Sequence, residues 1–441
     1  MAPELTIDSI RSTGLGALMR GVGLAVRFLP IPQPTLLVGP GSSARLGQAI
    51  AGFGHRKILI VTDSIISKLG LLNGLTDALQ AGGAAFVVFD RITPDAPIPL
   101  IEEGIDFYRA NGCDAIVAFG GGSSMDASKA IAVAISNPSK PLRKLAGYFK
   151  GLRPPVRVYA VPTTAGTGSE VTVAAVIADP ENQSKIVIVD TRMVPKMAAL
   201  DPSLMTGLPP HITAATGIDA LTHAIEAFVG NWCTPYSDGM ALSAVGLIFE
   251  NLRTAYRDGG NLQAREQMAL ASTYAGFAFT RANVGYVHAI AHQFGGRYHT
   301  PHGLANAIML PKVLAYSSPA ITGRLALLAV RAKVGTDDEP EDVLAQKFMD
   351  AVAALNADLG IPTFLATLKE ADIPALAKAA CWEAHTGYPV PRYMSQQVCE
   401  DIIRQALPPV AAAPKPAAKP AAKTAAKTAA KSAPRRKPAA T

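Results

Sequence analysis

Strand-length apolar segments alternate with helix-length segments in the first half of the chain, and this alternation restricts the possible folds more than any other feature. The segments are rich in Val and Ile, as buried parallel strands are. They read TLLVG (35–39), KILIVTD (57–63), AAFVVFD (84–90), DAIVAFG (114–120) and VRVYAVP (156–162). Helical patterns between them include 98–111 and 125–136. Strands and helices in alternation predict an open parallel sheet with right-handed crossovers.

The sequence changes character after DPSLMTGLPP (201–210). From there to about residue 407 it is rich in Ala and Leu, with helical periodicity and few β-branched runs. We therefore predict an α/β domain over 33–205 and an all-helical domain over 206–408. A chain of 441 residues is long enough to build two such cores. A cleft between two domains is the usual place for a small-molecule ligand.

The two ends of the chain fall outside these domains. Residues 1–32 form an N-terminal extension, in which 9–29 is predicted to be a basic amphipathic helix. We expect it to pack on the protein or on a partner subunit, with attachment to a membrane surface as the alternative. Residues 409–441 repeat Lys at every fourth position and predict a disordered cationic arm. This arm either binds a nucleic acid or another polyanion or is an inert solvated tail.

Composition excludes several classes of protein. A hydrophobic content of 49% with 17% charged residues is typical of a globular protein. The whole chain carries a net charge of +7 and residues 409–441 carry +8, so residues 1–408 carry −1 and do not suggest a nucleic-acid-binding fold. The four cysteines form no CxxC pair, which favours a reducing compartment. With no signal peptide and no uninterrupted apolar span, we expect a cytoplasmic protein.

Two polar loops directly follow predicted strands. In AIVAFGGGSSMDASKA, Gly120, Gly121 and Gly122 stand between a strand and a helix. Glycine there lets the backbone approach a pyrophosphate, and the N–H groups of the helix start attract the anion, although ordinary tight turns use glycine as well. The second loop, PTTAGTGSE (162–170), adds threonine hydroxyls. Loops after successive parallel strands line one edge of the sheet, where ligands bind in open α/β folds.

A carboxylate stands at the tip of an earlier strand. Asp63 ends KILIVTD, and a carboxylate in that place can accept hydrogen bonds from both ribose hydroxyls of an adenosine. It precedes the glycines, which is not the usual G-x-G-x-x-G arrangement. The alternative is a helix N-cap, and the residues alone leave the two interpretations equal.

Half of the eight histidines lie in YVHAIAHQFGGRYHTPHG (286–303). His288 and His292 are four residues apart, so both rings project from one face of a helix. We expect the glycines at 295–296 to end that helix and TPHG to turn the chain so that His302 returns to it.

A second helix supplies further candidate metal ligands. GIDALTHAIEAF places Asp219 and His223 four residues apart on one helix face. With His288 and His302 they form a set of nitrogen and oxygen donors suited to Fe(II) or Zn(II), with room for a substrate oxygen. Separate buried or surface histidines are the alternative.

The motifs GGGSSMDASKA, PTTAGTGSEVT, TAATGIDALTHAIEAF and VHAIAHQFGGRYHTPHGLANAIMLP resemble, in this order, the signatures of the iron-containing (group III) alcohol dehydrogenase family. The resemblance covers roughly residues 33–405. It implies an N-terminal dinucleotide-binding α/β domain and a C-terminal all-α metal-binding domain, a dehydroquinate synthase-like fold. It also implies hydride transfer between NAD(H) and a primary alcohol or aldehyde, with Fe2+, or Zn2+ as the alternative, acting as Lewis acid on the substrate oxygen.

The resemblance further implies roles for individual residues. The metal ligands of the family fall on Asp219, His223, His288 and His302. His292 matches a histidine beside the metal and is a candidate for proton relay, whereas His299 matches no required residue. The cofactor contacts of the family fall on Asp63, Gly121, Gly122, Ser123, Thr163, Thr164, Thr167, Thr172 and Lys185. One departure lies in TPDAP, where Asp95 stands in place of the usual Asn.

Two alternative functions are compatible with this sequence. A related enzyme would use the same site on another carbonyl, as maleylacetate reductases and hydroxyacid–oxoacid transhydrogenases do. A polyanion-binding protein would act through the tail alone, and candidate ligands at all four positions argue against it. We expect a homo-oligomer, a dimer or larger, that acts on a small alcohol or aldehyde.

Overall fold

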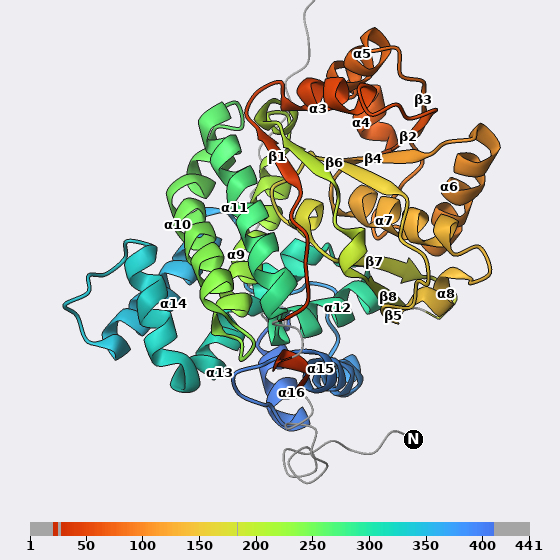
Figure 1. Cartoon of the computed structure of the whole chain (residues 1–441). Helices are drawn as coiled ribbons and strands as arrows, with labels where there is room; N and C mark the ends of the chain where they lie inside the picture. The colour runs from red at the N-terminus through yellow and green to blue at the C-terminus, as the bar shows by residue number, and fades with distance from the viewer. Residues whose placement is uncertain (1–20, 25–27, 183, 410–441) are drawn as a thin grey trace, which may run out of the picture. The chain divides into compact units, whose positions relative to one another are not determined.

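The computed structural model describes residues 21–24, 28–182 and 184–409 (Figure 1). The described residues up to Pro408 form one compact unit. The predicted cationic arm, apart from Pro409, lies outside the described residues, as does most of the helix predicted over 9–29. Residues 21–24 of that segment are helical.

A six-stranded parallel sheet, in the order β1-β9-β6-β4-β2-β3, forms the centre of the α/β region. Its strands are β1 (Thr35–Val38), β2 (Ile58–Val61), β3 (Phe86–Phe89), β4 (Ala115–Gly120), β6 (Arg157–Pro162) and β9 (Met197–Leu200). The five predicted strands are all present. The sixth, β9, was not predicted because its sequence, MAAL, is short and has no β-branched residue.

Helices cover both faces of this sheet. They are α3 (Ser42–Ala51), α4 (Ser64–Lys68), α5 (Asn73–Ala81), α6 (Ile98–Asn111), α7 (Gly122–Ser136) and α8 (Leu142–Leu145). Ile58 and Ile60 of β2 share a core with α3 and α5, whereas Leu59 and Val61 share another with α6 and α7. The central strands β2 and β4 read as continuous apolar runs because both of their sides are buried.

A second sheet, in the order β5-β8-β7, was not predicted. Its strands are β5 (Gly147–Tyr148), β7 (Ala174–Asp179) and β8 (Ser184–Val189), and β7 pairs with β8 antiparallel. Short 3-10 helices precede β7, η1 (Ser169–Val171), and follow β8, η2 (Thr191–Met193), and a further one, η3 (Pro202–Met205), follows β9 of the main sheet. The hairpin matters for the site because β8 carries Lys185.

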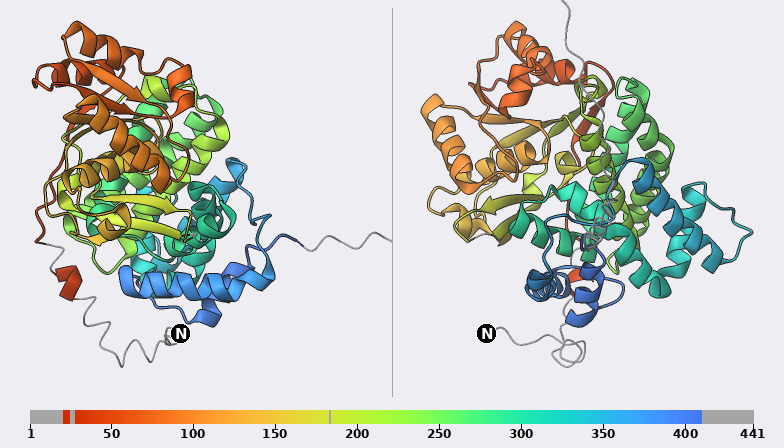
Figure 2. Two further views of the ribbon diagram at one scale, coloured as in Figure 1. Left: turned by 90° about the vertical axis from the view of Figure 1, so that its right-hand side faces the viewer. Right: turned by 180° about the vertical axis from the view of Figure 1, so that it is seen from behind.

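From Pro210 onward the described elements are helices, which lie beside the main sheet (Figures 1 and 2). They are α9 (Pro210–Val229), α10 (Pro235–Arg257), α11 (Leu262–Ala282), α12 (Tyr286–Tyr298), α13 (His302–Arg331), α14 (Glu341–Asp358), η4 (Glu370–Asp372), α15 (Ile373–Gly387) and α16 (Gln396–Arg404). Helix α9 contacts α10, α11 and α13, and its long buried stretch forms the centre of this region. The predicted fold class is confirmed, and the domain boundary near residue 205 stays a prediction.

The prediction that the glycines at 295–296 end a helix is wrong. Helix α12 continues through both of them to Tyr298, and His299, with φ of 54°, provides the left-handed residue that ends it. Gly295 faces Lys185 of β8, and a Cβ atom there would be in ordinary van der Waals contact with its Nζ, at 3.5 Å.

One described helix, α13, is long and apolar enough to cross a membrane by length and composition alone. Its buried apolar residues belong to the main core of the helical region, and it packs against α9, α12 and α14. Burial among other helices is sufficient to explain the hydrophobicity of such a helix.

Candidate functional site

Four side chains from three helices meet in the helical region. Asp219 and His223 are one turn apart on α9, His288 lies in the first turn of α12, and His302 is the first residue of α13. One donor atom from each lies within 4.8 Å of the others. The structure thus brings together all four residues that the sequence predicted as metal ligands, and all but His302 are fully buried.

The start of α13 is held against α9 by a glycine. A Cβ atom on Gly303 would lie 2.3 Å from the carbonyl oxygen of Ala215 and 3.3 Å from Cβ of Asp219. No side chain fits in that space, so the first turn of α13 touches α9 directly. This contact sets Nε2 of His302 at 3.5 Å from Oδ1 of Asp219.

Two buried nitrogen atoms make the cluster fit a divalent metal ion. Nδ1 of His223 and Nε2 of His288 are buried and form no hydrogen bond with any residue that the structure describes. Burial lowers the pKa of His223 and holds the pKa of His288 well below its ordinary value, so both rings are neutral with available lone pairs. Burial alone would raise the pKa of Asp219, but the surrounding imidazoles keep it below its ordinary value. One carboxylate and three neutral imidazoles suit Fe(II) or Zn(II).

Glu226 fixes the orientation of His288, and the sequence analysis did not identify it. Its Oε2 lies 2.6 Å from Nδ1 of His288 and also accepts the backbone N–H of Gly285, at 2.8 Å. Its Oε1 accepts the N–H of Val287 at 2.7 Å. The carboxylate therefore caps α12 from α9 and directs Nε2 of His288 into the cluster. Burial raises the pKa of Glu226 to about 7.

Asn306 is a second residue that the sequence analysis missed. Its Nδ2 donates a hydrogen bond of 2.7 Å to Oδ1 of Asp219 and lies 3.1 Å from Nε2 of His302. It is completely buried, one turn after His302 in an otherwise apolar stretch of α13. An amide in such a stretch was the available signal, as was the spacing of Glu226 from His223 on the face of α9.

His292 lies beside the cluster without belonging to it. Its ring stacks on that of His302, with centroids 5.3 Å apart, and its Nδ1 lies 2.6 Å from Oε1 of Glu383. Glu383, on α15, also accepts hydrogen bonds from Gln293 and from the hydroxyl of Tyr388. The sequence analysis missed Glu383 because it lies 91 residues from His292 and in no recognised motif.

The glycine loop and the threonine loop are in contact at the carboxyl ends of β4 and β6. A Cβ atom on Gly121 would lie 3.4 Å from Oγ1 of Thr164, and one on Gly122 would lie 2.7 Å from Cγ2 of Thr167. Helix α7 starts here without a side-chain cap or an acidic residue in its first turn. Its N–H groups and the bare glycine backbone fit the pyrophosphate of a dinucleotide.

The threonine loop also touches the helical region. A Cβ atom on Gly168 would lie 2.7 Å from the carbonyl oxygen of Ser272 on α11, and one on Gly166 would lie 2.7 Å from Cβ of Thr216 on α9. Thr273 donates a hydrogen bond of 2.7 Å to Glu170. The loop after β6 therefore connects the glycine loop to the helices that carry the histidine cluster.

The remaining predicted cofactor residues have other partners. Oδ1 of Asp63 accepts the N–H groups of Ile65 and Ile66, so Asp63 is the N-cap of α4. Oγ1 of Thr172 accepts a hydrogen bond of 2.8 Å from the buried Lys129.

Thr163 is buried, whereas Thr164 and Thr167 are partly exposed. Lys185 forms an ion pair of 2.7 Å with Asp95, whose N–H donates to Oγ of Ser123. The structure thus links Gly121 to Thr164, Gly122 to Thr167, and Ser123 to Lys185 through Asp95.

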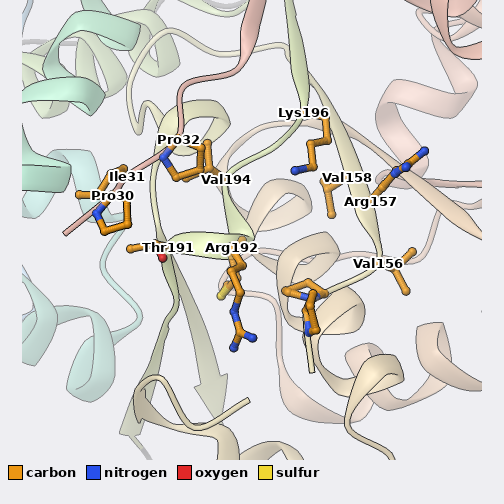
Figure 3. Close-up of a pocket in the computed structure, with 13 residues that line it drawn as sticks. Pro30, Ile31, Pro32, Val156, Arg157, Val158, Thr191, Arg192, Val194 and Lys196 are labelled. Atoms are coloured by element: carbon orange, nitrogen blue, oxygen red, sulfur yellow. The ribbon is translucent and has the colours of Figure 1, made fainter. Parts of the chain in front are cut away.

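A cavity of about 550 Å3 lies at the opposite edge of the sheet (Figure 3). It surrounds the start of β6 and the residue before β9, and residues of 30–32, 154–158 and 191–196 line it. Arg192 in its wall is paired with Asp190. The cavity contains none of the predicted site residues.

Known proteins share both halves of this arrangement. Residues 33–202 match the family described as iron-containing alcohol dehydrogenase, and residues 213–407 match the C-terminal part of the same family. The 1,3-propanediol dehydrogenase of Citrobacter freundii is 40% identical over 372 residues, which cover 83% of this chain and 96% of that protein. The chain belongs to the iron-containing alcohol dehydrogenase family. It is a metal-dependent alcohol dehydrogenase that uses iron and NAD.

Two further relatives support this assignment. The NAD-dependent methanol dehydrogenase of Bacillus methanolicus is 37% identical over 382 residues, covering 86% of this alcohol dehydrogenase and 99% of that protein. The crystal structure of a 1,3-propanediol oxidoreductase superposes with a TM-score of 0.83 at 38% identity. It covers 86% of this chain and 100% of its own.

Replacing Glu226 with Gln should lower the metal affinity of the enzyme about 10- to 100-fold. The amide keeps the size of the side chain but offers one acceptor oxygen in place of two, and His288 loses its fixed orientation. Competition with a chelator measures the affinity. Glu250→Gln, at an exposed position on α10 paired with Lys333, is the control and should behave as the wild type. If Glu226→Gln binds the metal as tightly as the wild type does, Glu226 caps α12 but is not needed to orient His288.

Proposed function

We propose that Asp219, His223, His288 and His302 hold the iron ion, and that the glycine and threonine loops beside them hold NAD. The enzyme would then interconvert a short primary alcohol and its aldehyde. The observation that carries the proposal is the pair of buried, unpaired imidazole nitrogens beside an ionised carboxylate. The names of relatives that act on 1,3-propanediol and methanol support a short primary alcohol as substrate.

When bound, iron supplies Lewis acidity toward the substrate oxygen and NAD supplies the hydride acceptor. The chain provides the path for the proton. With Nδ1 of His292 donating to Glu383, Nε2 carries the lone pair that accepts the proton of the alcohol. Glu383 then stabilises the imidazolium. Its side chain is 29% exposed, so the proton can continue from there to solvent.

Replacing either His288 or His302 with Ala should remove the bound metal and nearly all activity, because the remaining three side chains lose the geometry that the ion requires. Metal content per chain and turnover are measured together. His299→Asn is the matched control, since Asn tolerates the left-handed backbone of His299, and it should change neither quantity. Stoichiometric metal with wild-type turnover in the His302 variant would show that the ligand set is wrong.

We propose that Asp63 selects NAD(H) over NADP(H). Both N–H groups that it caps are bound by Oδ1, which holds the carboxylate at the strand tip. A 2′-phosphate beside that carboxylate would be repelled, and we expect discrimination of roughly a hundredfold.

Asp63→Ser keeps an oxygen that can cap α4 and removes the charge. It should therefore improve kcat/KM for NADP(H) with little change for NAD(H). Comparison of kcat/KM for both cofactors in the two proteins is the measurement. If the wild type has the same kcat/KM for both cofactors, Asp63 caps α4 and does not select the cofactor.

We also propose that the cationic arm, 409–441, binds a nucleic acid or another polyanion weakly and without sequence preference. Its charge of +8, with no acidic residue, supports this partner. Truncation after Pro408 should leave melting temperature and turnover unchanged and abolish retention on heparin at low salt. Retention that survives in the truncated enzyme, or binding that resists high salt, contradicts the proposal.

Assembly into a homo-oligomer is a further proposal. Tyr148, Phe149 and Leu152 are 58%, 45% and 76% exposed in and after β5, and large apolar side chains on a surface favour burial against another copy. Light scattering of the purified enzyme should give at least twice the mass of the chain, and a monomeric mass contradicts the proposal.

We propose a cytoplasmic location, which cell fractionation tests.

A further inference from the structure

The loop between β3 and α6 has an unusual backbone. Asp95 and Ala96 are consecutive residues other than glycine with positive φ, 66° and 46°. Such angles are rare for these residues and persist where surrounding contacts impose them. Three contacts of Asp95 do so. Its N–H donates to Ser123, its carbonyl oxygen accepts from Ala178, and its carboxylate binds Lys185 at 2.7 Å.

These contacts fix Asp95 between the two halves of the proposed site. Ser123 lies in the first turn of α7, directly after the glycine loop. Nζ of Lys185 lies against Gly295 of α12, the helix that carries His288 and His292. A dinucleotide that extends from the glycine loop to the histidine cluster must therefore pass the Asp95–Lys185 ion pair.

The ion pair weakens the attraction of Lys185 for an anion. The Lys185 side chain is 16% exposed and that of Asp95 is 36% exposed, so solvent screens the pair only in part. An ammonium already bound to a carboxylate attracts a diphosphate less than a free one does. The carboxylate also adds a negative charge near the path of an anionic ligand.

We infer that Asp95 sets the affinity of the enzyme for its cofactor, because its carboxylate competes with the diphosphate of NAD(H) for Lys185. This inference rests on the proposed cofactor site. Weaker binding of the dinucleotide means faster release, and release of the reduced cofactor is a common limit on turnover in enzymes whose chemical step is fast.

Asp95→Asn removes the charge of the side chain and keeps its shape. Asn keeps the oxygen that accepts from Lys185, and it tolerates a left-handed backbone at least as well as Asp. The backbone N–H bond to Ser123 is unaffected. The matched control is Asp106→Asn on α6, which removes the same charge from an exposed side chain paired with Arg109.

The test measures the Kd of NADH by fluorescence, with the full-length, metal-loaded enzyme at low ionic strength. Asp95→Asn should bind NADH roughly five- to tenfold more tightly than the wild type, with a slower dissociation rate constant in stopped flow. The gain should be smaller for NAD+, which carries less negative charge, and should shrink at high salt. Asp106→Asn should match the wild type.

Unchanged or weaker NADH binding by Asp95→Asn, at an unchanged melting temperature, would overturn the inference. Lys185→Met separates this failure from a failure of the proposed site. If Lys185→Met weakens NADH binding while Asp95→Asn does not strengthen it, the cofactor site stands and the inference about Asp95 falls. If neither variant changes NADH binding, the placement of the cofactor is wrong as well.

Discussion

The arrangement of the site depends on one buried carboxylate. Glu226 extends from α9 and accepts N–H groups from Gly285, Val287 and His288, so it supplies the cap that α12 lacks in its own sequence. An ionisable group buried without partners would be unfavourable, and here three donors satisfy it. The same bonds set the separation of α9 and α12 and the orientation of an imidazole. A single side chain therefore links the packing of α9 and α12 to the orientation of His288.

The sequence was sufficient to predict those helices and strands whose own residues show the pattern that their burial requires. The apolar run of β2 was predicted because burial on both sides imposes it. Helix 98–111 was predicted with the bounds of α6 because its buried residues recur at helical spacing on one face. Strand β9 was missed because its neighbours β1 and β6, and not its own side chains, make it a strand. The glycines at 295–296 misled the prediction because α12, packed on α13 and α15, stays helical through both of them and ends at His299.

The same distinction applies to the site. The candidate ligands were found because Asp219 and His223 lie one turn apart on α9, and His288 and His302 lie within a histidine-rich segment that matches a family motif. Glu226, Asn306 and Glu383 were not found, because each acts on a partner 62, 87 or 91 residues away and a single sequence does not report that distance. Asp63 shows the opposite case: its cap on α4 is local and visible in the structure, whereas its effect on a cofactor stays a proposal.

The threonine loop is a tight connection between the α/β region and the helices. Gly166 and Gly168 leave no space between this loop and the helices α9 and α11, and the contacts of the α/β region with the helices are concentrated in η1, η3, β8 and β9. Strands β2 and β3 lie on the other side of β4. Asp63, at the tip of β2, is therefore less constrained by the helical region than the loop after β6, which lies directly against α9 and α11.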